Sequence, residues 1–484
     1  MLHSGFMIER IRKRWRGPGG CANVLSLAFP LILNSSAHTI QMFVDSVFLA
    51  RHSQEEMAAA VQASILSFTV ISLFLGIAQY VNAFVAQYTG AARPRRVGPA
   101  VWQGVHFSFA SGLLILFLIP LAEPFFNWVG HDQTHRQYEI IYFRIICISA
   151  GPLLINSSLA SFFTGRGKTW TVMLVNSGGT VVNLILDYCL IFGHFGFPEW
   201  GIKGAAWATV VAHSFSAIVF FLLFMQAKYR RQFHTIGGFR LDRKLFRRLL
   251  RFGAPNGIQF FLDMLAFSFF VIFVGRISKP ALEATSMTFR INVLAFLPMI
   301  GLGIAVTTMV GQALGRNQPA LAQRTTWSAF FLTLTYMSLM ALGYWFFPES
   351  YIAAFMERDS TEFSRLAPMI TNLLGFVGFY CLFDTGNIIF AAALKGAGDT
   401  RFVMRVAVIL SWSIMVLPTY LVVKFDGGLY TAWIFATIYV CVLAFVYLLR
   451  FVHGKWKSMR VIEAPPLSAT SAPPAMPTTE ADTP

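Results

Sequence analysis

Four aspartates stand inside long apolar stretches of the sequence: Asp45, Asp187, Asp263 and Asp384. Charged residues make up only 12% of the 484-residue chain, and most of them lie between the apolar stretches. A carboxylate at membrane depth costs a few kcal/mol or more, so it persists only where it faces a cavity or a partner. These four acids are therefore the first candidates for ion or substrate binding.

Two of the acids end matching stripes of polar residues. The first stripe comprises Asn34, His38, Gln41 and Asp45, and the second comprises Asn176, Thr180, Asn183 and Asp187. The residues of each stripe have offsets of 0, 4, 7 and 11, which place them on one face of a helix. Such a stripe in an apolar helix should face protein or water. Interhelical hydrogen bonding would explain the amides well, but it explains the carboxylates poorly.

The other two acids have more aromatic surroundings. Polar residues share their helix faces: Asn256 and Gln259 for Asp263, and Tyr380 and Asn387 for Asp384. Both acids fall near mid-membrane, among Phe260, Phe267, Phe379 and Phe383. Phenylalanine-rich walls usually face lipid. Acids in an aromatic cavity would nevertheless attract lipophilic organic cations by charge and cation–π contacts.

The composition and the apolar stretches predict the helices that carry these residues. The chain is 56% hydrophobic and its mean hydropathy is +0.60, which is typical of polytopic membrane proteins. About 20 apolar residues cross a bilayer as a helix, whereas barrel strands would alternate over about 10 residues. The sequence therefore predicts an all-α polytopic membrane protein with twelve spans: 25–49, 57–86, 101–121, 138–163, 173–192, 204–225, 252–274, 284–311, 327–347, 370–394, 402–423 and 431–449.

The distribution of basic residues predicts the orientation. Lys and Arg number 28 in the segments predicted to face the cytoplasm and 8 in the outer loops, while Arg144 and Arg290 fall within spans. This bias predicts a plasma (inner) membrane protein with both termini cytoplasmic. The net charge of +16 therefore does not indicate nucleic-acid binding. The basic loop around Arg240–Arg251 is expected to meet anionic lipid headgroups.

The predicted topology places three oxygen-bearing side chains at one depth. Asp45, Asp187 and Thr209 each lie about five residues from the outer end of their spans, which is roughly 8 Å at 1.5 Å per residue. Two neighbouring carboxylates do not both ionise easily, so such a pair shares a proton readily. Together with Asn183, these oxygens predict a site for a proton or for sodium, a hard cation.

The sequence also predicts a division into parts. They are a basic cytoplasmic N-terminus (1–24), an N-lobe of six helices (25–225), a basic cytoplasmic linker (226–251), a C-lobe of six helices (252–449) and a cytoplasmic tail (450–484) that is disordered from about 463. No cleavable signal peptide is expected. The five cysteines include no CxxC pair, so a disulfide or a cysteine metal site is not expected.

The two lobes are predicted to be repeats. A shift of 225 residues aligns Pro30 with Pro255, Arg51 with Arg276, Ala59 with Ala284, Gln87 with Gln312, and Gly90 with Gly315. A shift of 231 aligns 165–169 with 396–400. Six spans per repeat give both halves the same orientation. Parallel repeats related by an axis along the membrane normal are typical of transporters, with substrate sites near the interface between halves.

Two short motifs resemble motifs of enzymes, but neither has the sequence context that the enzyme motif requires. Gly165–Thr169 ends like a phosphate-binding loop, yet the first glycine of that motif would fall on Phe162 and no strand precedes it. Gly396-Ala397-Gly398-Asp399 resembles the GxGD motif of intramembrane aspartyl proteases, but Asp399 is predicted to lie in an inner loop. We therefore expect turns between spans and no enzymatic activity.

Several motifs together resemble the multidrug and toxic compound extrusion (MATE) transporters. They are Gln41-x3-Asp45 followed by Ala58-Ala59-Ala60, Gly303-Ile304-Ala305 leading to Val310-Gly311-Gln312-x2-Gly315, and Ala393-Leu394-Lys395-Gly396-x-Gly398-Asp399-Thr400-Arg401. The resemblance spans about residues 20–450. It implies twelve helices in two six-helix lobes related by a pseudo-two-fold repeat, and export of drugs or organic cations by antiport with protons or sodium.

The resemblance also implies functional residues. In the N-lobe it assigns ion coupling, including a possible sodium site, to Asp45, Asn183 and Asp187, with Thr209 as a further oxygen. In the NorM-like branch, acids on the seventh and tenth helices are functional as well. Asp384 matches the second, whereas Asp263 stands where that branch typically has Glu. Arg290 could pair with one of these two acids, which would weaken an ion site there.

Lipid-linked oligosaccharide flippases share this architecture and remain an alternative. Those carriers place several basic residues in the cavity, whereas here only Arg144 and Arg290 lie within spans, against four aspartates. An ion channel is a further alternative. We expect no cofactor, a proton or sodium as coupling ion, small-molecule organic cations or drugs and membrane lipids as partners, no nucleic acid, and a monomer.

Overall fold

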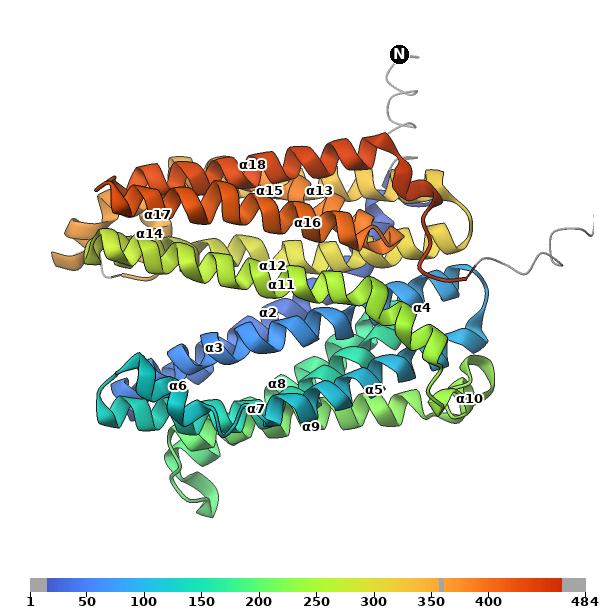
Figure 1. The fold of residues 1–484 in the computed structure, drawn as a ribbon, viewed down its shortest axis with the longest axis horizontal. Helices are drawn as coiled ribbons and strands as arrows, with labels where there is room; N and C mark the ends of the chain where they lie inside the picture. Colours follow the sequence, from blue (N-terminus) through green and yellow to red (C-terminus); the bar gives the residue numbers. More distant parts are fainter. Residues whose placement is uncertain (1–14, 357–360, 464–484) are drawn as a thin grey trace, which may run out of the picture.

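The computed structural model describes residues 15–356 and 361–463, and these residues form helices and no strand (Figure 1). The N-lobe contains α2 (Cys21–His52), α3 (Gln54–Gln79), α4 (Val81–Gly90), α5 (Val97–Leu116), α6 (Ala122–Val129), α7 (Gln133–Thr164), α8 (Thr169–Phe192) and α9 (Ile202–Phe224). After α10 (Ala227–Phe233), the C-lobe contains α11 (Arg243–Ile277), α12 (Lys279–Gly315), α13 (Pro319–Phe346), α14 (Pro348–Ala353), α15 (Thr361–Ala397), α16 (Thr400–Leu410), α17 (Leu417–Lys424) and α18 (Leu429–His453). The parts of the expected terminal segments at 1–14 and 464–484 lie outside the described residues.

Twelve helical segments of the described chain are long and apolar enough to cross a membrane, which confirms the predicted number. Several boundaries differ from the prediction, and two of the differences have a clear local cause. The third span ends at Leu116 rather than 121, because a turn and the short helix α6 follow it. The seventh helix begins at Arg243, inside the predicted linker, because the Asp242 side chain caps it by accepting from the backbone N–H groups of Lys244 and Leu245.

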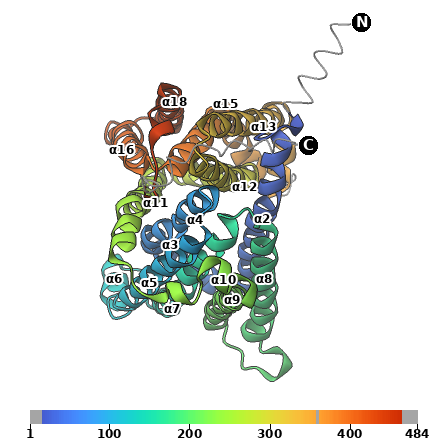
Figure 2. The ribbon, with the colours of Figure 1, turned by 90° about the vertical axis from the view of Figure 1, so that its right-hand side faces the viewer.

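The helices form two lobes (Figure 2). In Figure 1 the lobes are close together at the end that holds α4 and α10, and they diverge towards the opposite end. The residues that cap equivalent helices are repeated as well. Ser53 caps α3 by accepting from the Glu56 N–H, and Ser278, 225 residues later, caps α12 by accepting from the Ala281 N–H. The first two helices of each lobe are therefore joined by the same tight connection.

The lobes meet at a contact that we call the seam, formed by Gln87, Gly90, Gln312 and Gly315. A Cβ atom at Gly90 would collide with the backbone oxygen of Gln312, and one at Gly315 would collide with the backbone oxygen of Gln87. Only glycine allows α4 and α12 to approach this closely. The Gln-x2-Gly motif that the duplication produced thus packs against its own repeat.

Hydrogen bonds cross the seam in a symmetric pair. Gln87 Nε2 donates to the Gly396 backbone oxygen at 2.9 Å, and Gln312 Nε2 donates to the Gly165 backbone oxygen at 2.9 Å. Each glutamine therefore reaches the glycine turn of the other lobe. Asn82 and Thr308 add a buried bond between α4 and α12 at 3.0 Å. These buried bonds fix the two lobes to each other at the α4 end.

The first helix of each lobe begins in the core of the other lobe, which we call the exchange of chain ends. Val24, Ala28 and Leu31 in the first half of α2 belong to a core cluster that is otherwise made by the C-lobe. Leu245 and Leu249 in the first turns of α11 belong to a core cluster of the N-lobe. Each lobe therefore completes its core with a helix from the other.

Residues 455–463, which we call the C-terminal strap, cross from the C-lobe to the N-lobe. Trp456 is buried in the C-lobe core, whereas Val461 and Ile462 pack in the N-lobe core. The Val461 N–H donates to Gln87 Oε1 at 2.9 Å. Glu463 then accepts from the Tyr88 hydroxyl at 2.6 Å and forms ion pairs with Arg96 at 2.8 Å and Arg248 at 3.2 Å. The strap therefore spans the seam.

Candidate functional site

The two polar stripes of the N-lobe face each other. They lie on α2 and α8, which pack together. Asn176 Nδ2 donates to Asn34 Oδ1 at 2.9 Å, and the Thr180 hydroxyl donates to Gln41 Oε1 at 3.2 Å. The first bond joins matching positions of the two stripes, whereas Thr180 bonds to the residue one position further along the stripe of α2. The amides and hydroxyls satisfy one another, which leaves the acids at the end of the series.

Asp45 and Asp187, the carboxylate pair, meet at the Asn183 amide. When the amide nitrogen faces the acids, it donates to Asp45 Oδ1 at 3.1 Å and to Asp187 Oδ2 at 3.2 Å. The two carboxyl groups also lie within hydrogen-bonding reach of each other. Asn183 and Asp187 are fully buried. The structure therefore brings together three of the four residues expected in the N-lobe site.

The carboxylate pair lacks a basic partner. No Lys, Arg or His of the described residues forms an ion pair with either acid. Asp187 Oδ1 is buried and makes no hydrogen bond with the described protein atoms. A buried acceptor of this kind is costly, and a proton shared between the two carboxyls would remove that cost. The geometry therefore suits a group that gains and loses a proton.

Other groups lie around the carboxylate pair. The Tyr142 hydroxyl on α7, which sequence reasoning missed, lies within electrostatic range of both acids and accepts from the Ser64 hydroxyl at 3.3 Å. Thr209, the fourth expected residue, donates its hydroxyl hydrogen to the Ala205 backbone oxygen of its own helix at 3.1 Å. Its oxygen has no hydrogen bond to the acids within the described structure.

The acids of the C-lobe are arranged separately. Gln259 Nε2 donates to Asp263 Oδ2 at 3.2 Å, and Asn387 Nδ2 donates to Asp384 Oδ1 at 3.0 Å. Each acid is thus bonded to an amide of its own helix, one turn away. Tyr439 on α18 lies within electrostatic range of both. The C-lobe therefore has two separate carboxylates rather than a pair.

Lys395 is a functional candidate that lies one residue beyond the predicted tenth span, 370–394. It lies near the end of α15 and interacts electrostatically with Asp263, without a direct ion pair in the described structure. Lys395 follows Asp384 by eleven residues, which is about three helical turns, so both lie on one face of α15. That spacing was the signal available in the sequence.

Two further predicted residues bond elsewhere. Asn256 Nδ2 donates to the Gly76 backbone oxygen of α3 at 2.7 Å, so it joins the two lobes. The Tyr380 hydroxyl accepts from Asn292 Nδ2 of α12 at 3.0 Å. Within the described structure, neither side chain forms a hydrogen bond with Asp263 or Asp384.

The expected pairing of Arg290 with an acid of the C-lobe is not formed. Arg290 is exposed, and in the described chain it makes no ion pair with Asp263 or Asp384. Arg144, the other basic residue predicted within a span, pairs with Glu123 of α6 at 3.1 Å. Neither arginine opposes the buried acids.

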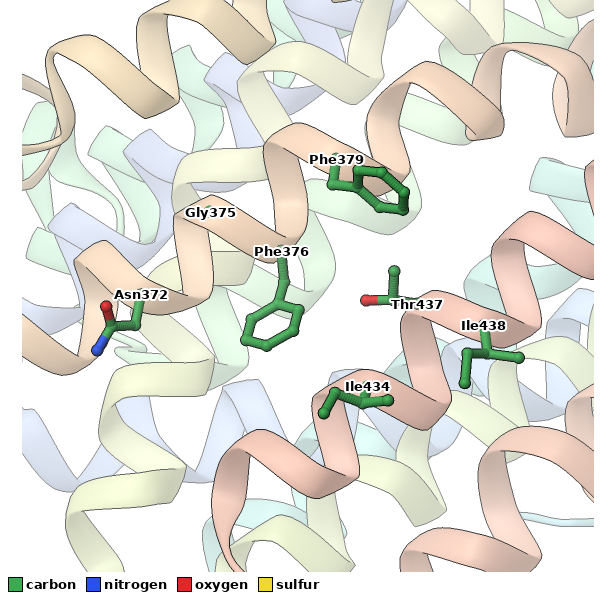
Figure 3. A pocket seen from close by; sticks show the side chains of 7 residues that line it. All are labelled: Asn372, Gly375, Phe376, Phe379, Ile434, Thr437 and Ile438. Carbon is green, nitrogen blue, oxygen red and sulfur yellow. The ribbon is translucent and has the colours of Figure 1, made fainter.

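A pocket of about 430 Å³ lies between α15 and α18 (Figure 3). Phe376 and Phe379 from α15 and Ile434 and Ile438 from α18 point towards it. None of the four acids lines it. Phe379 is also 46% exposed, so this aromatic group forms an apolar surface groove rather than a cage around Asp384.

Twelve membrane helices in two repeated lobes, with acids buried in both, define a secondary transporter architecture. The chain belongs to the MatE family, which matches residues 30–189 and 255–421. It is therefore a multi-pass membrane transporter and not an enzyme. The recognised resemblance is thus confirmed, and so is the two-lobed helical fold.

Relatives and solved structures agree with this assignment. The chain is 26% identical over 435 residues to a "Probable multidrug resistance protein NorM" of Neisseria meningitidis serogroup A, covering 88% of this chain and 93% of the relative. A Thermotoga maritima protein with the same description is 25% identical over 446 residues, covering 91% and 94%. The fold matches an outward-facing multidrug resistance MATE transporter with a TM-score of 0.82 at 19% identity, covering 92% of this chain and 98% of that one.

Proposed function

We propose that this transporter exports organic cations or lipophilic drugs by antiport, and that protons drive it through the carboxylate pair. The observation that supports this most directly is the meeting of Asp45 and Asp187 at one buried amide without a basic partner in the described structure. Curated relatives described as multidrug resistance proteins support drugs as the cargo.

The arrangement of donors favours a proton over sodium. Sodium, like other hard cations, needs about six oxygen ligands. Here the Asn183 amide donates to one oxygen of each acid when its nitrogen faces them, so its own oxygen points away. The Thr209 hydroxyl bonds within its own helix. Two carboxyl groups sharing one proton need no further ligand.

The proposed transport cycle uses two ends of the molecule: the end near the carboxylate pair and the end that holds the seam. The carboxylate pair lies two turns before the end of α2 that is remote from the seam, so it takes up a proton from that side. Release to the other side requires the lobes to rock until the seam opens. Asp263 and Asp384 would attract the cationic cargo, since they are separate negative charges in apolar surroundings.

We further propose that the seam end is cytoplasmic and that the membrane is the inner one. The excess of basic residues in the segments at that end supports this orientation. A pocket of about 270 Å³ between α11 and α16 is lined by Arg251, Arg401 and Arg405, which suits an anionic lipid headgroup. Impermeant maleimide labelling of single cysteines at Phe195 and Ser458, in a variant without the five native cysteines, tests the orientation. Labelling of Phe195→Cys alone from outside intact cells is expected, and labelling of Ser458→Cys instead would reverse it.

The function is tested in proteoliposomes at constant membrane potential, with a pH gradient and no sodium. Efflux of a fluorescent organic cation should follow the pH gradient in the wild type. Transport that requires inward sodium and is indifferent to the pH gradient would overturn the proton assignment. No saturable transport under either gradient would overturn the drug-antiport proposal itself.

A further inference from the structure

Three side chains with metal-ligand atoms gather where α7 begins, at the end of the N-lobe remote from the seam. They are His131, His135 and Glu139, which follow one another at intervals of four residues. His131 Nδ1 lies 3.1 Å from both oxygens of Glu139, and His135 Nε2 lies 3.8 Å from Glu139 Oε1. One potential ligand atom of each residue lies within 4.8 Å of the others.

The carboxylate at the centre of this group is buried. The Glu139 side chain is only 1% exposed, and in the described structure its ion-pair partners are these two histidines, with no Lys or Arg. Burying a carboxylate is costly unless a cation compensates it. Two imidazole rings that lie beside one buried carboxylate place three good zinc ligands around a common point.

We propose that His131, His135 and Glu139 bind one divalent transition-metal ion, for which Zn²⁺ has the best match. Zinc accepts two imidazole nitrogens and a carboxylate oxygen in a tetrahedral site, with ligand distances of about 2.0–2.2 Å. Ligand atoms around such an ion lie roughly 3.3 Å apart, so the group needs only small side-chain rotations to close on a metal. His131 is 38% exposed, which leaves one side of the site open to solvent.

Gln62 on α3 supplies a neighbouring oxygen. Its Oε1 lies 3.0 Å from His135 Nε2, the atom that would bind the metal. The amide oxygen is therefore next to the fourth coordination position, which water could fill instead. A bound ion would join the start of α7 to α3, at the end of the N-lobe where the lobes diverge. This site is distinct from the carboxylate pair, and the proposal does not depend on what the protein transports.

The test uses full-length protein without a polyhistidine tag, purified in detergent and stripped with a chelator. We expect about one Zn²⁺ per chain by elemental analysis after dialysis, and a zinc-dependent rise in Tm because the ion binds the folded state. Co²⁺ in place of zinc should give the visible absorption bands of a tetrahedral site. Affinity should fall at about pH 5.5, because protonated imidazole does not bind metal.

Three variants separate this site from adventitious binding. Glu139→Gln keeps the size of the side chain, and His135→Ala removes one nitrogen ligand. Each should weaken zinc binding on the order of 100-fold, since even outer-shell changes cost 10–100-fold. His194→Ala is the control, because this histidine follows α8 and stacks on Tyr188 of that helix, so its loss should leave zinc binding unchanged.

The outcomes are decisive in both directions. Loss of the stoichiometric zinc and of the cobalt bands in Glu139→Gln, with the size-exclusion profile of the wild type, supports the site. If His135→Ala fails to fold, Glu139→Gln and His131→Ala provide the same comparison. Wild-type protein that binds no zinc, or binds it as well in the Glu139→Gln and His131→Ala variants, would show a hydrogen-bonded cluster only and overturn the proposal.

Discussion

The two lobes have the same helix plan, but they arrange their buried acids differently. In the N-lobe, acids from α2 and α8 meet at the Asn183 amide. In the C-lobe, Asp263 and Asp384 each bond to an amide of their own helix, and Lys395 lies near Asp263. A pair without a cation suits a shared proton, whereas separate acids suit attraction of a charged cargo.

The difference shows where duplication preserves sequence and where it does not. The glutamines and glycines of the seam repeat because they pack against each other, so a change in one half harms both. The hydrogen bonds of the four acids, in contrast, stay within one half of the described chain, so the acids were free to diverge between the lobes.

The largest expected effect is the loss of coupling in the N-lobe. Asp187→Asn removes the carboxyl group that shares a proton with Asp45, so efflux driven by a pH gradient should fall about 100-fold or more. Asp45→Asn should behave alike. The control is Asp426→Asn, an exposed loop residue with φ of 52° that Asn also tolerates. Near wild-type efflux in both variants of the pair would remove the N-lobe from the coupling mechanism.

The next largest effect is expected on the stability of the seam, to which the two lobes contribute equivalent glycines. Gly90→Ala and Gly315→Ala each place a methyl group against a backbone oxygen, which should destabilise the closed seam by about 1–3 kcal/mol. Both should shift the protein towards seam-open states to a similar extent, measured as the distance between spin labels on α4 and α16. A shift in only one of them would contradict the symmetry of the contact.

In the C-lobe we expect a change in cargo affinity rather than in coupling. Asp384→Asn should raise the apparent KM for a monovalent cationic drug about tenfold, which corresponds to about 1.4 kcal/mol. The pH dependence of efflux should remain that of the wild type. Equal loss for a neutral substrate would assign Asp384 a structural role instead.

Asp263 gives a smaller and more specific test, because Lys395 is its neighbour. Asp263→Glu should transport better than Asp263→Ala, since only the former keeps a negative charge near Lys395. Lys395→Met should partly restore Asp263→Ala by removing the isolated charge. Wild-type transport by Asp263→Ala alone would assign this pair no part in transport.

The smallest effect is expected at the C-terminal strap. Partial burial tends to raise the pKa of Glu463, but the Tyr88 hydrogen bond and the charges of Arg96 and Arg248 outweigh it, so the pKa lies below its usual 4.5. The ionic contacts are therefore complete above about pH 4.5 and are lost only at lower pH. Glu463→Gln should weaken the closed seam by about 1 kcal/mol. It should leave the pH profile between about 5 and 8 unchanged, and an altered profile would link the strap to coupling.

The sequence predicted the spans well, because the length of an apolar stretch decides whether a helix crosses a membrane. It also predicted the helix faces of Asp45 and Asp187, since an offset of eleven residues fixes a face whatever surrounds the helix. The start of α11 was missed, although Asp242 followed by a basic helical segment is an ordinary N-cap signal.

Contacts between distant residues were not predictable in the same way. The direction of Arg290 depends on which face of α12 packs against the lobe, and hydrophobic length does not reveal that. The crossed bonds of Gln87 and Gln312 require the relative position of two lobes. Glu139 and its histidines were not predicted as a site, because a spacing of four residues places them on one helix face without showing that the carboxylate is buried.

The exchange of chain ends has a consequence for any attempt to divide the protein. A cut between α10 and α11 yields two fragments, and each retains helical segments that belong to the core of the other: Val24 to Leu31 on one side, Leu245 and Leu249 on the other. Each fragment alone would expose that apolar core surface. Co-expressed halves should therefore recognise each other and rebuild a working protein, which makes this transporter suited to a split-protein reporter whose signal depends on assembly.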